Sequence, residues 1–264
     1  MTGAPRADYG LLDRSGAGSF VFYPRRDHTP PPDGSVDIDI PAEPGVVLGA
    51  RLYTADPALP TVLYFHGNGE VVSDHDGIAP LYHAIGCNLF VVDYRGYGRS
   101  GGSPSFAALV ADAHIAADRF HAELDERAFS GHRFVMGRSL GSHPALELAA
   151  HRPGRFRGLI IESGAANLRR LARFASAAVP ADEVEALVKA HEAKIRAIRL
   201  PVLIIHGERD ELIPVELAAA LYDLLEGTQR DLLIIPGGGH NDILWLGQRE
   251  YLAAIQRFVR GQPG

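Results

Sequence analysis

Short runs of apolar residues recur along most of the chain, as is typical of strands that are buried on both faces. The runs cover residues 62–65, 89–92, 134–136, 159–161, 202–205 and 232–235. Between them lie segments with the apolar spacing of amphipathic helices, among them residues 106–124 and 252–259. This alternation predicts an α/β fold, with a mostly parallel sheet and helices on both of its faces.

The N-terminal part of the chain has a different pattern. Residues 1–35 are rich in proline, glycine and aspartate, which predicts an extended arm with turns. Val36, Ile38 and Ile40 then alternate with aspartates, as expected of a half-exposed strand at a sheet edge, and residues 46–54 fit its hairpin partner. We therefore expect an arm over residues 1–35 and one α/β domain over residues 36–264.

One connection is too long for a single crossover helix. After the run at 159–161 the next strand begins only near Val202, and two amphipathic segments lie between, at 168–179 and 182–198. An extra pair of helices inserted at one position of such a fold usually acts as a cap over part of the domain. We expect a small helical cap insertion at about residues 165–199, with a longer connection packed against the sheet as the alternative.

Composition narrows the functional classes. The chain has 264 residues, 46% of them hydrophobic, which suits one domain with a large core. Its net charge of −6 gives no electrostatic basis for binding nucleic acid or an anionic membrane. The single cysteine, Cys87, lies in an apolar stretch typical of the core, so neither a disulfide nor a cysteine metal site is expected. With no secretory signal pattern and no apolar run of about 18 residues, we expect a cytoplasmic protein without membrane insertion.

The strongest chemical signal is Gly137-Arg138-Ser139-Leu140-Gly141, which follows a predicted strand and precedes a predicted helix. G-x-S-x-G between a strand and a helix is typical of a nucleophile elbow, in which a sharp turn lifts the serine hydroxyl above the sheet. The two glycines allow the strand and the helix to pass close together. The alternative is a serine in an ordinary turn.

A nucleophilic serine needs a base, and the base needs an orienting acid. His240 lies in a glycine-rich loop after the last predicted strand, at the carboxyl end of the sheet, where α/β sites form. Asp210 follows the strand at 202–206 and gives the chain order Ser139, Asp210, His240. Glu162 also closes a strand and is the competing acid. We favour Asp210, because it lies farther into its loop and can turn toward His240.

A further loop, His66-Gly67-Asn68-Gly69-Glu70, follows the strand at 62–65. Such a loop can direct a backbone N–H group at an oxyanion, together with the N–H group of Leu140 after the serine. A plain tight turn is the alternative.

Taken together, these motifs resemble those of the serine branch of the α/β-hydrolase superfamily, from about Val36 to Val259. The matching stretches are HGNGE at 66–70, DYRGYGRSGG at 93–102, GRSLG at 137–141, HGERDELIP at 206–214 and GGGHND at 237–242. They are similar to a branch of small hydrolases that includes uncharacterised bacterial members and eukaryotic enzymes that remove acyl groups from protein cysteines. The resemblance implies that Asn68 and Leu140 supply the oxyanion N–H groups. The N-terminal cysteine clusters of membrane-bound deacylases are absent from this sequence.

The expected activity is that of a serine hydrolase, which cleaves a small or medium carboxylic ester through an acyl-enzyme on Ser139. No metal or organic cofactor is expected. An acyl thioesterase is the nearest alternative, and a peptidase, acyltransferase or lyase would use the same residues. A catalytically silent binding module on the same fold is the alternative from another class.

Overall fold

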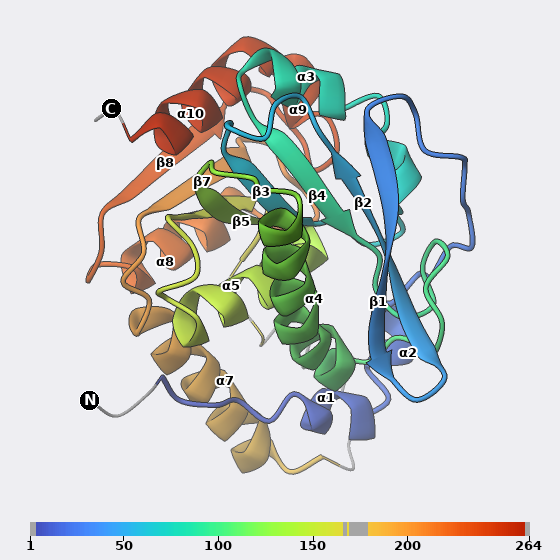
Figure 1. Cartoon of the computed structure of the whole chain (residues 1–264). Coiled ribbons are helices and arrows are strands. Elements are labelled where there is room, and N and C mark those ends of the chain that lie inside the picture. Colours follow the sequence, from blue (N-terminus) through green and yellow to red (C-terminus); the bar gives the residue numbers. More distant parts are fainter. Residues whose placement is uncertain (1–3, 166–167, 169–178, 262–264) are drawn as a thin grey trace.

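A computed structural model describes residues 4–165, 168 and 179–261 of the chain. A mixed sheet of eight strands crosses the described part of the molecule in the order β1-β2-β4-β3-β5-β6-β7-β8 (Figure 1). The strands are β1 Ser35–Glu43, β2 Val46–Tyr53, β3 Thr61–Phe65, β4 Asn88–Val92, β5 Arg133–Arg138, β6 Leu159–Glu162, β7 Val202–Gly207 and β8 Arg230–Ile235. The pairings β1–β2 and β2–β4 are antiparallel and all others are parallel, so the predicted fold class is confirmed.

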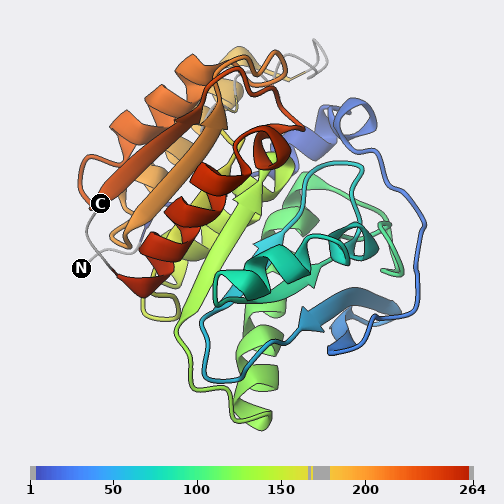
Figure 2. The same cartoon turned by 90° about the horizontal axis from the view of Figure 1, so that it is seen from above.

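Helices cover both faces of this sheet. They are α1 Gly10–Arg14, α2 Gly18–Val21, α3 Ala79–Ala84, α4 Phe106–Glu126, α5 Ser142–His151, α7 Ala181–Arg196, α8 Val215–Leu224, α9 Ile243–Leu246 and α10 Gln248–Arg260, with 3₁₀ turns η1 Val72–His75 and η2 Ser139–Gly141. Helices α4, α5 and α8 lie on one face, whereas α3, α9 and α10 lie on the other (Figures 1 and 2). No helix in the described part of the chain has the length and apolar character needed to cross a bilayer.

The uninterrupted apolar runs follow from this arrangement. In β3, Leu63 and Phe65 belong to the hydrophobic cluster beneath α4 and α5, while Val62 and Tyr64 belong to the cluster beneath α3 and α10. Successive side chains point to opposite faces of a strand, so a strand covered on both faces needs apolar residues at every position. Cys87 is fully buried in the second cluster, as its surroundings predicted.

Strand β1 lies at the sheet edge, where the alternating pattern placed it. Ile38 and Ile40 are buried and Asp39 between them is exposed. Its predicted partner at 46–54 is β2, with Ile38 opposite Ala50 in the antiparallel register. Both predictions about this hairpin are confirmed.

The N-terminal segment is fastened to the domain at several points. It contains α1 and α2, two short helices that its composition did not indicate. Asp13 accepts hydrogen bonds from the backbone N–H groups of Phe106 and Ala107 at the start of α4. Tyr9 reaches α7, where its hydroxyl contacts His191 Nδ1 at 2.6 Å. The segment therefore ties α4 to α7 and is part of the packed structure.

The long connection after β6 contains α7, which matches the second predicted amphipathic segment. Helix α7 packs against α1, α5 and α8. Its buried Lys194 donates to Glu147 of α5 at 2.7 Å and to Tyr9, so a fully paired charge anchors it. The first predicted segment, 168–179, lies outside the described residues except for its two ends. The cap at about 165–199 therefore stays a prediction.

The Asp13 cap should contribute measurably to stability. Replacing Asp13 with Ala removes two acceptors from the α4 N-terminus and should lower the free energy of unfolding by about 1 kcal/mol. Urea denaturation measures this change. Asp118→Ala is the control, because the Asp118 side chain is 56% exposed and forms a surface ion pair with Arg152, so the denaturation midpoint of this variant should stay at the wild-type value. Equal midpoints for the two variants would contradict the role of Asp13.

Candidate active site

The turn after β5 holds Ser139 in a strained backbone conformation. Its φ angle is 50°, in the left-handed region that side-chain-bearing residues rarely adopt. The turn is possible because the chain crosses itself closely. A Cβ atom on Gly137 would lie 2.1 Å from the carbonyl oxygen of Gly141, and one on Gly141 would lie 2.0 Å from that of Phe65. These contacts explain both glycines of the G-x-S-x-G motif.

The three residues predicted from separate loops form one chain of hydrogen bonds. His240 Nε2 lies 2.9 Å from Ser139 Oγ, and His240 Nδ1 lies 2.7 Å from Asp210 Oδ2. A carboxylate can only accept, so Nδ1 carries the proton and Nε2 is left to accept from the serine hydroxyl. The three groups follow β5, β7 and β8, which are parallel, so their carboxyl ends lie at the same end of the sheet.

Two hydrogen bonds from backbone N–H groups join the loops of Asp210 and His240. The N–H group of Arg209 donates to the carbonyl of Gly238 at 2.8 Å, and the N–H group of Gly237 donates to the Glu208 carboxylate at 2.8 Å. A Cβ atom on Gly207 would lie 2.4 Å from the Gly238 carbonyl, so this approach also depends on glycine. The separation of acid and base is therefore set by backbone geometry as well as by their own hydrogen bond.

Asp210 is buried and held in its charged form. Its Oδ1 atom accepts from the backbone N–H groups of Leu212 at 2.9 Å and Ile213 at 2.7 Å. Burial by itself raises the pKa of this carboxyl, but the hydrogen bonds from His240 and Ile213 lower the pKa below its ordinary value overall. An ionised Asp210 can fix the tautomer of His240 and stabilise its cation.

Glu162, the competing acid, lies at the end of β6 with other partners. It accepts from Tyr251 Oη at 2.6 Å and from Arg138 Nε at 3.2 Å. Burial raises the pKa of this carboxyl, and the nearby Arg138 charge offsets that effect only partly. The structure thus places Asp210, and not Glu162, against His240.

Asn68 lies in the loop after β3, and both polar atoms of its side chain form hydrogen bonds. Its Oδ1 atom accepts from Tyr97 Oη at 2.7 Å and from the backbone N–H of Tyr23 at 3.0 Å, while its amide donates to the carbonyl of Val21. The N-terminal segment thus borders the loop from which an oxyanion N–H group was predicted. No sequence pattern indicates this contact, because the partners in the N-terminal segment are backbone groups some 45 residues away along the chain.

Large apolar side chains are exposed on the segments around the site. Leu212 follows Asp210, Trp245 and Leu246 follow His240, and Tyr23 borders Asn68; each is more than half exposed.

Comparison with known proteins fits this arrangement. Residues 56–191 match the family described as serine aminopeptidase, S33, and residues 124–261 match the prolyl oligopeptidase family. The chain belongs to the α/β-hydrolase superfamily. The two matches together span all the strands of this hydrolase from β3 to β8.

Relatives of this hydrolase occur in bacteria and in vertebrates. An uncharacterised protein of Mycobacterium tuberculosis is 31% identical over 228 residues, which cover 84% of this chain and 78% of that protein. Alpha/beta hydrolase domain-containing protein 17B of Xenopus laevis is 35% identical over 208 residues, or 75% of this chain and 66% of that protein. The fold is similar to that of the Pyrococcus furiosus esterase Pf2001, with a TM-score of 0.72 at 18% identity, covering 92% of this chain and all of that one.

The two acids should respond differently to loss of charge. Asp210→Asn keeps the shape but favours the wrong His240 tautomer, so kcat for ester hydrolysis should fall by about 10⁴, as in the serine-protease triad. Glu162→Gln, as the matched control, should cost far less. Steady-state kinetics on both folded variants measure this. An inactive Glu162→Gln protein beside an active Asp210→Asn protein would reverse the assignment.

Proposed function

We propose that this hydrolase cleaves a small or medium carboxylic ester through an acyl-enzyme on Ser139. The observation that carries the proposal is the position of His240, which bridges Ser139 Oγ at 2.9 Å and Asp210 Oδ2 at 2.7 Å. A serine hydroxyl becomes a useful nucleophile only when such a base can take its proton. The strained backbone of Ser139, in the 3₁₀ turn η2 that leads into α5, supports the same role.

The first half of the proposed reaction forms the acyl-enzyme. Ser139 Oγ attacks the ester carbonyl while His240 Nε2 takes the hydroxyl proton. The backbone N–H groups of Leu140 and Asn68 would bind the oxygen of the tetrahedral intermediate. His240 then gives its proton to the departing alkoxide, and the alcohol leaves.

The second half returns the enzyme to its starting state. A water molecule attacks the acyl carbonyl while His240 takes one of its protons, and the carboxylic acid leaves as Ser139 Oγ recovers the proton. Asp210 stays ionised throughout and stabilises the imidazolium form of His240. Every proton is accounted for by these groups and water.

The surroundings of the site favour an apolar group on the substrate. The exposed side chains of Leu212 and Trp245 follow Asp210 and His240 in the chain, and exposed Tyr23 borders Asn68 through its backbone N–H group. The predicted cap at about 165–199 would limit the length of the acyl chain. The solved relative from Pyrococcus furiosus is named an esterase, which agrees with an ester as substrate.

Removing the nucleophile should abolish hydrolysis without unfolding the protein. For Ser139→Ala we expect kcat for p-nitrophenyl butyrate to fall by about 10⁴ to 10⁶. A fluorophosphonate probe should label the wild type and not this variant. Ser103→Ala, a change at an exposed serine, is the control and should label normally. A folded Ser139→Ala protein with near-normal activity would refute the proposal.

The length of the acyl chain should affect the rate of hydrolysis if the predicted cap limits the space for the acyl group. A panel of p-nitrophenyl esters from acetyl to palmitoyl should give higher kcat/KM for short and medium chains than for long ones. Acyl-thioesters of the same lengths and amino-acid p-nitroanilides extend the panel to the thioesterase and peptidase alternatives. Equal rates from acetyl to palmitoyl would contradict the size limit, and a preference for thioesters or anilides would replace the ester assignment.

A further inference from the structure

We propose that Arg138, the residue before Ser139, is a positioning residue that fixes the His240 loop and the Asn68 loop relative to the nucleophile. The inference rests on the proposed function and adds to it a group that touches no reacting atom. Being adjacent to Ser139 at the end of β5, Arg138 shares the rigid backbone of the turn.

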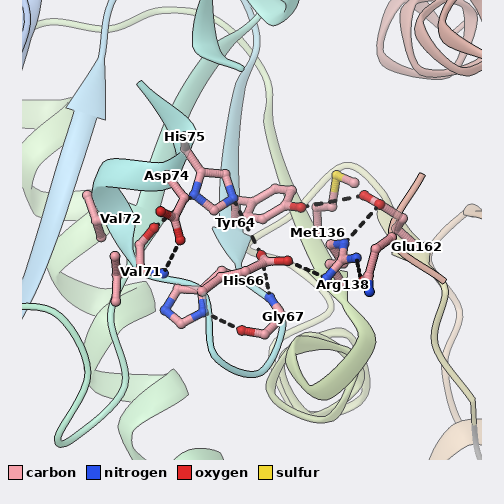
Figure 3. A network of polar contacts seen from close by, with 12 residues as sticks. Tyr64, His66, Gly67, Val71, Val72, Asp74, His75, Met136, Arg138 and Glu162 are labelled. Atoms are coloured by element: carbon pink, nitrogen blue, oxygen red, sulfur yellow. Dashed lines mark hydrogen bonds and ion pairs between the residues drawn. The ribbon is translucent and has the colours of Figure 1, made fainter. Parts of the chain in front are cut away.

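The guanidinium of Arg138 contacts three other segments, and Figure 3 shows its contact with Glu162. Its second terminal nitrogen donates to the carbonyl oxygen of His240 at 3.0 Å and to Asn241 Oδ1 at 2.8 Å. Its first terminal nitrogen donates to Glu70 Oε1, and Nε donates to Glu162 Oε1 at 3.2 Å. One side chain thereby joins the ends of β3, β6 and β8 to the end of β5.

The contact with Glu70 continues to the predicted oxyanion loop. Glu70 Oε2 accepts from the backbone N–H of Gly67 at 2.8 Å, directly before Asn68. A Cβ atom on Gly67 would lie only 2.2 Å from the Arg138 guanidinium, so the loop is packed directly against it. A shift of Arg138 would therefore move the peptide unit that carries the Asn68 N–H group.

The carboxylate of Glu162 holds the guanidinium from the other side. Glu162 Oε2 accepts from Tyr251 Oη at 2.6 Å, and Tyr251 Oη lies 3.1 Å from Tyr82 Oη, so the carboxylate is anchored to α10 and α3. Burial raises the pKa of Glu70 by itself, but the Arg138 charge lowers it overall. The cation is thus balanced by an ionised Glu70 and oriented by Glu162.

The geometry explains why arginine is needed here. Arginine presents five N–H donors in a rigid plane, and four acceptors are used in this structure. Lysine has one nitrogen on a flexible stem and cannot reach the Glu70 carboxylate, Glu162 and the His240 carbonyl together. Arg138→Lys therefore keeps the charge and loses the simultaneous contacts.

Loss of positioning should appear in the chemical step. A displacement of about 1 Å at a catalytic group can cost 10²-fold in rate. For Arg138→Lys we expect kcat for p-nitrophenyl butyrate to fall by about 10- to 100-fold with KM within about threefold, because no contact to the ester is lost. The rate of fluorophosphonate labelling at Ser139 should fall in proportion.

The matched control is Arg51→Lys. Arg51 is also buried and donates to Asp37 at 2.7 Å, to Asp76 at 2.8 Å and to the carbonyl of Thr29, but its partners lie outside the candidate site. Both variants should lose thermal stability, measured as Tm. Only Arg138→Lys should show a lower kcat. The value is measured per folded molecule, at a temperature where both variants are folded.

The outcomes separate this inference from the proposed function. A wild-type kcat in folded Arg138→Lys, or an equal fall in Arg51→Lys, would overturn the positioning role while leaving the serine mechanism intact. If the wild type itself neither hydrolyses the ester nor reacts with the probe, the proposed function fails instead. A selective fall in kcat and labelling rate for Arg138→Lys is the result that supports the inference.

Discussion

The close crossing of the backbone at Ser139 constrains every other group in the candidate site. Strand β5, the turn and helix α5 pass within contact distance of each other and of the end of β3, so a Cβ atom on Gly137 or Gly141 would overlap a carbonyl oxygen. This contact fixes the start of α5 and brings the loop after β3 beside the serine. The positive φ of Ser139 is the local cost of that approach.

The buried charges of the described residues are paired, and their partners determine what each can do. Glu162 ends β6 and Asp210 lies in the loop after β7, both at the carboxyl end of the parallel strands, yet Asp210 has a lowered pKa and Glu162 a raised one. The difference comes from the donors around them: His240 and two backbone N–H groups for Asp210, and Tyr251 with a shared Arg138 for Glu162. Two similar carboxyl groups are thereby given to different tasks, one beside the imidazole and one within a structural network.

Much of the fold could be predicted because short local patterns in the sequence indicate its strands and helices. Uninterrupted apolar runs indicated strands covered on both faces, and the alternation at 36–40 indicated the edge strand. The order of Ser139, Asp210 and His240 after three strands could be predicted because parallel strands place their carboxyl ends together. The two short helices at the N-terminus could not, since each spans about one turn and a helix this short is stable only through contacts with the rest of the protein.

The sequence by itself determined the fold class, the elbow and the three residues that meet there, because each rests on short motifs and on periodicity. Only the tertiary structure decided the partners of Arg138, which lie 24 to 103 positions away along the chain. It also decided that the N-terminal segment borders Asn68 and that Glu162 faces Tyr251 instead of His240. Such contacts depend on how the loops pack at the end of the sheet, and a charged residue in a motif gives no local sign of which distant group will balance it.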